Sequence, residues 1–138
     1  TGETRETGLD DLDAEFPMIA PSWLGRRNRF TYQQLIPVEV PATFEALVKV
    51  DIHTRQHERY DYGAGIYGSE SPFAARAGAG PDAAEDDGYI LSFVTDTSDW
   101  SSACLVFNAQ QLADGPIARV QLPHRVPAGF HATWLPAA

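Results

Sequence analysis

The chain has 138 residues, enough for one domain with a hydrophobic core, and its ten basic and nineteen acidic residues give a net charge of −9. That charge repels a phosphate backbone and argues against nucleic acid as a partner. No run of about 18 apolar residues is present to cross a bilayer. The single cysteine, Cys104, excludes a disulfide within the chain, and its apolar neighbours predict a buried thiol that fits a reducing cytoplasm.

The residues that interrupt the chain predict an all-β protein. Eleven glycines and ten prolines fall between short runs rich in β-forming residues. The predicted strands are residues 29–36, 46–52, 56–62, 89–95, 102–108 and 117–122. No segment between them has a convincing helical period, and only residues 82–86 are expected to form a single turn. Two antiparallel hairpins follow, at residues 47–62 and 89–108.

The start of the chain predicts that a part lies upstream. Residues 1–6 have the composition of a turn followed by a strand, without an initiator methionine. We therefore expect the chain to begin within a hairpin, with the preceding part missing or supplied by another chain. Successive hairpins suit a sandwich, a barrel or a propeller, and composition does not choose among them. A four-stranded propeller blade needs about 40–45 residues, so this length corresponds to about three blades.

Two motifs favour structural rather than binding roles. Residues 63–68 satisfy the spacing G-x-G-x-x-G of dinucleotide-binding loops. Such a loop must lead into a helix that receives the pyrophosphate, whereas residues 69–72 include a proline and have no helical period, so a glycine-rich loop is predicted. The basic cluster at residues 26–29 lacks interleaved aromatic residues and is interpreted as a solvated loop.

The acidic stretches at residues 9–13 and 82–88 lack the ligand spacing of a calcium-binding EF-hand loop. Residues 85–88 are instead interpreted as a capped turn that leads into the strand beginning near Tyr89. No G-x-S-x-G motif or Ser/His/Asp set indicates nucleophilic catalysis.

Two of the four histidines are interpreted as solvated. His53 and His57 have the i, i+4 spacing of two zinc ligands on a helix. They lie at a predicted hairpin turn, however, and no third ligand is close in the sequence.

The other two histidines lie near the end of the chain. His124 has prolines on either side, which favours a loop in which it contacts backbone, although it remains an alternative second ligand. His131 lies in the apolar run 130–134, which is expected to be buried. A buried neutral imidazole needs a hydrogen-bond partner, a metal or both. The residues alone therefore leave a packed core histidine and a metal ligand both open.

Four segments share a pattern with one enzyme family. They are AEFPMI at residues 14–19, YGSESPF at 67–73, EDDGY at 85–89 and LPHRVPAGFHATW at 122–134. In this order they resemble the carotenoid cleavage oxygenases, a family that includes the lignostilbene dioxygenases. The resemblance covers nearly the whole chain but only the C-terminal part of the much longer family members.

The resemblance implies an all-β fold, with residues 1–138 as the C-terminal part, about three blades, of a single seven-bladed β-propeller domain. It implies a non-haem iron(II) dioxygenase that cleaves a C=C bond of a carotenoid, apocarotenoid or stilbene with O₂, giving two carbonyl products. His131 would be the last of four histidine ligands of Fe(II), the other three lying in the N-terminal remainder of the propeller. The isolated chain is expected to be inactive. A hydrophobic substrate also allows peripheral membrane contact through parts outside this chain.

Two glutamates have implied roles beside the metal. Glu15 and Glu70 are each flanked by an apolar or aromatic residue and a proline, which predicts burial and a partner. The resemblance implies that they accept ring N–H groups of iron-bound histidines, Glu70 serving His131 and Glu15 a histidine upstream of Thr1. A Glu70–His131 distance of about 2.7–3.0 Å is expected. Many relatives have proline directly after the second glutamate, whereas Ser71 intervenes here.

Two other readings remain open. One is a non-catalytic β module for binding or structural support, in which His131 is merely packed. The other is an independent domain with a different activity, which the family order of the four segments disfavours.

Overall fold

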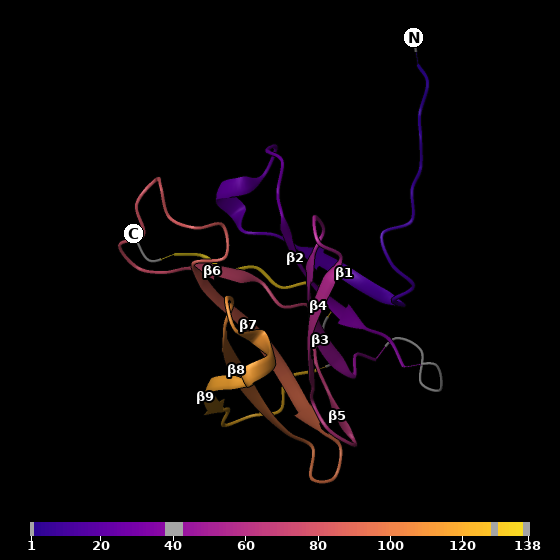
Figure 1. Cartoon of the computed structure of the whole chain (residues 1–138). Coiled ribbons are helices and arrows are strands. Elements are labelled where there is room, and N and C mark those ends of the chain that lie inside the picture. Colours follow the sequence, from indigo (N-terminus) through magenta and orange to yellow (C-terminus); the bar gives the residue numbers. More distant parts are fainter. Residues whose placement is uncertain (1, 38–42, 128–129, 137–138) are drawn as a thin grey trace.

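A computed structural model of the chain describes residues 2–37, 43–127 and 130–136. These residues form two antiparallel β-sheets side by side, with two short 3₁₀ helices, η1 at Pro21–Trp23 and η2 at Leu112–Asp114 (Figure 1). Residues 2–13 contain no strand and run away from the sheets, so the strand expected near residue 6 is wrong. These residues are exposed, apart from partly buried Leu12, and add no strand to either sheet, although the Asp13 carbonyl accepts a hydrogen bond from the Ile36 N–H at 3.0 Å.

The first sheet has the strand order β1-β2-β3-β4. Its strands are β1 Ala14–Met18, β2 Phe30–Leu35, β3 Ala46–Asp51 and β4 Gln56–Asp61. All six residues of β3 are buried because both faces of the sheet are covered at this strand. Leu47 faces the second sheet, whereas Val48 and Val50 belong to a smaller cluster on the opposite face, against Leu12 and Ala14.

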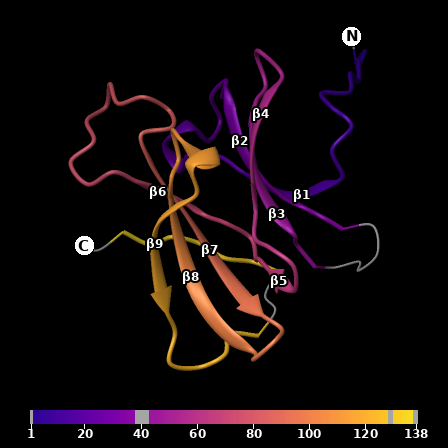
Figure 2. The same ribbon diagram turned by 60° about the horizontal axis from the view of Figure 1, so that its bottom comes forward.

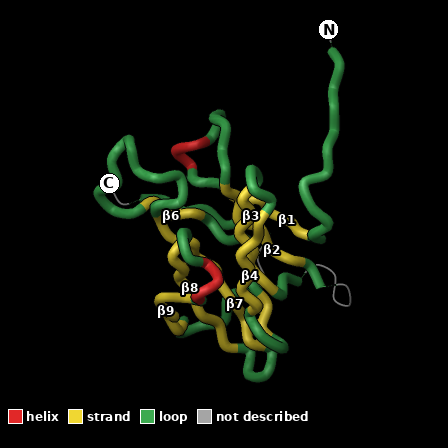
Figure 3. Tube along the Cα trace, in the orientation of Figure 1, coloured by secondary structure: helices red, strands yellow, loops and turns green. Residues whose placement is uncertain are grey.

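The second sheet has the order β5-β7-β8-β9, and β6 also pairs with β7. Its strands are β5 Ile66–Tyr67, β6 Phe73–Ala75, β7 Gly88–Asp96, β8 Ser101–Asn108 and β9 Pro116–Gln121. Figure 2 shows the long β7–β8 hairpin from the side, with β9 along its outer edge. Segments without regular structure fill the rest of the trace (Figure 3).

The main hydrophobic core lies between the two sheets. Burying one large apolar side chain contributes about 1.5–3 kcal/mol to stability, so the buried side chains of this core together fix how the two sheets face each other. Its larger members are Tyr32 and Leu47 from the first sheet and Ile90, Val94, Leu105 and Phe107 from the second.

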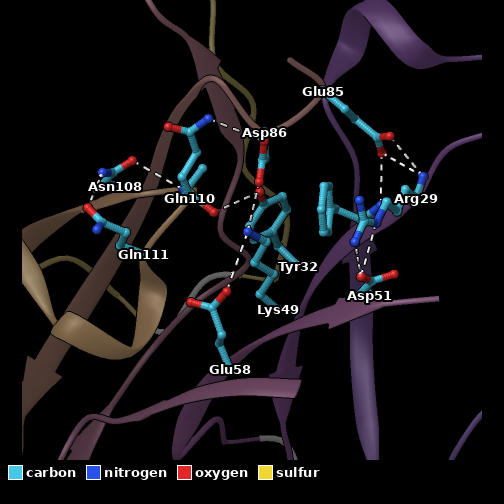
Figure 4. Close-up of polar contacts among 12 residues, drawn as sticks. Arg29, Tyr32, Lys49, Asp51, Glu58, Glu85, Asp86, Asn108, Gln110 and Gln111 are labelled. Atoms are coloured by element: carbon cyan, nitrogen blue, oxygen red, sulfur yellow. Dashed lines mark hydrogen bonds and ion pairs between the residues drawn. The ribbon is translucent and has the colours of Figure 1, made fainter. Parts of the chain in front are cut away.

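A polar clamp also joins the sheets, formed by Arg29, Lys49, Asp51, Glu85 and Asp86 (Figure 4). The Glu85 carboxylate accepts hydrogen bonds from the backbone N–H groups of Arg29 and Phe30 at 2.8–2.9 Å. Lys49 Nζ lies 2.9 Å from Asp86 Oδ2 and 3.5 Å from a Glu58 carboxylate oxygen. The turn before β7 is thereby fastened to β2 and β3.

The structure confirms the six predicted strands, each to within one residue at either end, and both predicted hairpins. Residues 82–86 form turns without a helix. The described residues make two sheets rather than the three blades that the length of the chain suggested, because residues 2–13, 122–127 and 130–136 lie outside the strands. Among the described residues, no helix is long and apolar enough to span a bilayer.

Candidate active site

Glu70 and His131 lie next to each other, although they are far apart in the sequence. Glu70 follows β5 and is only 8% exposed. Its Oε2 accepts a 2.5 Å hydrogen bond from the backbone N–H of Ala132 and lies 3.5 Å from Nδ1 of His131. The expected direct hydrogen bond of 2.7–3.0 Å is therefore not formed. The carboxylate is held by the backbone beside the histidine and faces its ring.

His131 is not buried, contrary to the sequence analysis. Its side chain is 81% exposed, and Phe130 and Trp134 are 51% and 45% exposed. Residues 130–136 follow the last strand and lie outside both sheets, so the apolar composition of this run does not place it in the core. The packed core-histidine interpretation does not describe His131 in this structure.

A bulge in β1 directs Phe16 toward His131. The pairing of β1 with β2 shifts between Glu15 and Met18, and Phe16 has a φ of 53°. A bulge re-aims a side chain, and a non-glycine residue in this region costs about 1–3 kcal/mol. The Phe16 ring stands edge-on to the His131 ring at 5.2 Å and contacts Phe44 at 5.3 Å and Phe130 at 5.9 Å. Phe16 therefore links the imidazole to a cluster of three phenylalanine rings.

Glu15 precedes Phe16 in β1 and is exposed. Its carboxylate makes no hydrogen bond or ion pair with the residues that the structure describes. The expected burial is wrong because β1 is the edge strand of its sheet and every second side chain points away from the protein. Its role beside an upstream histidine stays a prediction.

The other histidines are not gathered at this site. His53 is exposed in the β3–β4 turn, and Nε2 of His57 lies 3.6 Å from Asp10. His124 is exposed and makes no hydrogen bond within the described residues, so the backbone contact expected for it is absent there. Residues 2–37, 43–127 and 130–136 contain no group of three His, Cys, Asp or Glu side chains that could hold a metal ion. His131 as a metal ligand stays a prediction.

A largely apolar pocket of about 290 Å³ opens beside His131. Phe93, Val126 and Pro127 form much of its wall. The same three residues also line a neighbouring pocket of about 240 Å³ that extends to Tyr67 and Trp100. An apolar molecule that contacts His131 would thus find further apolar surface next to it.

The remaining motifs have structural roles. The glycine-rich loop at residues 63–68 leads into the short strand β5 and not into a helix, as predicted. The predicted turn is formed by residues 85–87, and the strand begins at Gly88. Glu85 and Asp86 belong to the polar clamp, and Asp87 pairs with Arg76. Cys104 is buried at 8% exposure, as expected.

Sequence reasoning missed Phe16 as a neighbour of His131, and Phe44 as a neighbour of Phe16 and Phe130. A signal was present for Phe16, since a Phe-Pro pair inside a strand interrupts regular pairing. No local pattern marks Phe44, whose contact with Phe130 depends on the tertiary fold.

A family comparison decides what this arrangement belongs to. The family model described as retinal pigment epithelial membrane protein matches residues 1–136. The chain belongs to this family, that of the carotenoid cleavage dioxygenases.

Individual relatives agree with the family match. The chain is 33% identical over 145 residues to carotenoid 9,10(9',10')-cleavage dioxygenase 1 of Pisum sativum, covering 96% of the chain and 26% of that protein. It superposes on a lignostilbene dioxygenase of Pseudomonas brassicacearum with a TM-score of 0.83 and 27% identity, covering 94% of the chain and 28% of that structure. Against cobalt-substituted apocarotenoid oxygenase of Synechocystis the TM-score is 0.81 at 26% identity, covering 91% and 26%.

The chain thus spans about a quarter of the length of these carotenoid cleavage dioxygenases. Its structural neighbours are β-propeller enzymes, and the two sheets correspond to a fragment of such a propeller. The all-β propeller fold and the family resemblance are both confirmed.

Proposed function

We propose that residues 1–138 are the C-terminal segment of a single β-propeller domain in a non-haem iron(II) dioxygenase. The complete protein would use O₂ to cleave a C=C bond of a carotenoid, apocarotenoid or stilbene to two carbonyl products. The observation that carries the proposal is the buried carboxylate of Glu70 held beside the exposed imidazole of His131, within a chain of this family. The N-terminal remainder of the propeller would supply the other iron ligands.

The residues present fit one ligand position of such a site. Nδ1 of His131 faces the Glu70 carboxylate, whereas Nε2 makes no hydrogen bond with the described residues. Imidazole nitrogen suits iron, and a metal-bound histidine usually presents its other ring N–H to a carboxylate or carbonyl. A relative in cobalt-substituted form supports a metal site in this fold.

When bound, iron(II) would supply the activation of dioxygen. His131 would contribute one nitrogen ligand, and Glu70 would hold the tautomer and orientation of its ring through Nδ1. The hydrogen bond from the Ala132 N–H keeps this carboxylate on the chain segment that carries the histidine. The Phe16 ring packs edge-on against the imidazole of His131, and the adjoining apolar pocket offers a surface for an apolar alkene.

Two further predictions about the complete protein stay open. They are its location in the cytoplasm and a peripheral membrane contact through parts outside this chain.

The test compares His131→Ala with His124→Ala in the complete protein. His124 is a matched control because it is an exposed histidine on the same segment after β9. The wild type and His124→Ala are expected to hold about one iron per propeller and to cleave carotenoid or stilbene substrates. His131→Ala is expected to lose iron and turnover together.

Iron is measured by elemental analysis and the carbonyl products by chromatography. Equal losses in the two variants would show that His131 is not the ligand. A complete wild-type protein that binds no iron and cleaves no alkene would instead favour the non-catalytic β module.

A further inference from the structure

Four buried polar side chains form a continuous hydrogen-bond chain directly behind Glu70. Gln34 in β2, Tyr62 after β4 and Ser92 in β7 meet Ser71, the residue that follows Glu70. Their exposures are 1%, 6%, 0% and 2%, so water does not compete for these bonds. The hydrogen-bond chain, defined as Ser92, Tyr62, Gln34 and Ser71, links both sheets to the segment that carries the carboxylate.

The bonds have one consistent direction. Gln34 Nε2 donates to Ser71 Oγ at 2.9 Å, so its Oε1 is free to accept the Tyr62 hydroxyl proton, also at 2.9 Å. With the Tyr62 proton used in this way, Ser92 Oγ donates to the Tyr62 oxygen across 2.8 Å. Ser71 in turn donates to the Ser69 carbonyl at 3.1 Å. Burial raises the pKa of Tyr62 to about 12, so this hydroxyl keeps its proton at neutral pH.

The close approach of Tyr62 to Gly68 holds the same segment from the other side. A Cβ at Gly68 would lie 2.6 Å from Cζ and 2.8 Å from the hydroxyl oxygen of Tyr62. The Tyr62 ring cannot easily move aside, because it is buried and its hydroxyl is bonded twice. Only glycine therefore fits here, two residues before Glu70, and Gly68 N–H donates to the Phe44 carbonyl at 2.8 Å.

This arrangement is costly unless every partner is present. A buried polar group that lacks its hydrogen-bond partner lowers the stability of the folded protein by about 1–3 kcal/mol, whereas apolar side chains of the same shape need no such partner. No described buried side-chain nitrogen or oxygen lacks a partner, so the requirement is met here. The hydrogen-bond chain ends on the residues that flank Glu70, and its geometry fixes their backbone relative to both sheets.

We propose that Gln34, Tyr62, Ser71 and Ser92 are positioning residues for the metal site, because they hold the Glu70 carboxylate where it orients His131. The inference deepens the proposed function and rests on it. Removal of one hydroxyl loosens Glu70, weakens its hold on the Ala132 N–H and lowers iron affinity without removing a ligand.

The main comparison is Tyr62→Phe against Tyr32→Phe in the complete protein. Tyr32 is a matched control because it is also a buried tyrosine, 2% exposed, whose hydroxyl bridges the two sheets. It donates to the Ala109 carbonyl at 3.1 Å, however, and has no bond to the hydrogen-bond chain. Both variants are expected to lower the unfolding temperature. Only Tyr62→Phe should weaken iron binding, by about 10-fold, the lower end of the range for residues that support metal ligands.

A second comparison asks whether Ser71 acts through Glu70. Ser71→Ala is expected to lower iron affinity in the wild-type background but not further in a Glu70→Gln background. A residue with only a structural role would lower the affinity by the same factor in both backgrounds.

A third measurement does not depend on iron. The Ala132 N–H donates directly to Glu70, so its hydrogen exchange reports how firmly the carboxylate is held. In metal-free complete protein, exchange of the peptide covering residues 130–136 should be faster in Tyr62→Phe and Ser71→Ala than in Tyr32→Phe.

The outcomes separate the two proposals. If His131→Ala keeps full iron occupancy, the proposed function fails, and the role in orienting a metal ligand fails with it. If iron binding depends on His131 but Tyr62→Phe matches Tyr32→Phe in affinity and in exchange, the proposed function stands and the positioning role is overturned. Faster exchange with a non-additive loss of affinity supports the positioning role.

Discussion

Replacement of Lys49 by methionine is expected to be one of the most destabilising single changes in this chain. The Lys49 side chain is 5% exposed, and its ammonium group pairs with Asp86, whose side chain is 14% exposed. It also lies 4.4 Å from the centre of the Phe30 ring. Methionine keeps the apolar stem but leaves the Asp86 carboxylate, among the described residues, with only a 3.4 Å contact from Gln110. Breaking a buried pair from one side costs about 3–5 kcal/mol.

The double variant Lys49→Met/Asp86→Leu should recover much of that loss, because both charges then leave the buried site and apolar groups of similar size replace them. Arg59→Met is the matched control. It removes the same charge from the exposed Arg59–Asp61 pair, whose side chains are 46% and 63% exposed. Such surface pairs contribute about 0–1 kcal/mol.

The assay is guanidinium unfolding of the complete protein, with midpoints compared at equal slope. The reasoning about the polar clamp is refuted if Lys49→Met shifts the midpoint no more than Arg59→Met. It is also refuted if the double variant is less stable than Lys49→Met, since the unpaired Asp86 would then not be the source of the cost.

Further expectations concern single residues. Glu15→Gln should lower the iron affinity of the complete protein by about 10–100-fold without changing its melting temperature, since the Glu15 carboxylate has no bond to the described residues. An unchanged affinity would show that Glu15 does not belong to the site. The Arg29 guanidinium, with backbone N–H groups, holds the pKa of Asp51 well below its usual 3.8. The charged Asp51 carboxylate therefore stabilises the folded protein above pH 3.8, and this contribution is lost as the pH falls through the lowered pKa. Asp51→Asn should therefore lower the melting temperature at pH 7 and less so in strong acid, and a constant difference would contradict this. Burial raises the pKa of the Cys104 thiol, so mass spectrometry should find this residue unmodified by thiol reagents until the protein unfolds.

The long strands could be predicted because their pattern is local. The runs that became β2, β3, β4, β7, β8 and β9 alternate or cluster apolar residues between turn-forming ones, and this pattern needs no distant partner to be recognised. The strands β1, β5 and β6 have 5, 2 and 3 residues. Their pairing depends on neighbours that only the fold supplies, and Pro17 interrupts β1.

The residue types at the site could be predicted from the sequence, but whether their side chains are buried could not. The pairing of Glu70 with His131 followed from the family resemblance, and the structure brings the two side chains together at 3.5 Å. Apolar neighbours in sequence wrongly suggested that His131 and Glu15 are buried, because sequence does not show whether another layer of chain covers a segment. Gln34 is two residues after Tyr32 in β2, so both side chains point to the same face of the strand, and both are buried. A buried polar group could therefore have been predicted at Gln34. Its partners Tyr62 and Ser71 lie on other elements and could not.

The contact between Phe16 and His131 joins two segments with almost the whole described chain between them. Closing so long a loop has a high entropic cost, and contacts of this kind form late in folding. During synthesis, β1 and the Glu70 segment leave the ribosome well before His131, so both sheets can assemble before His131 has been added to the chain. The place beside Glu70 is thus completed only after the residues of both sheets have been made, and a nascent chain that ends before His131 would carry both sheets but no histidine beside Glu70.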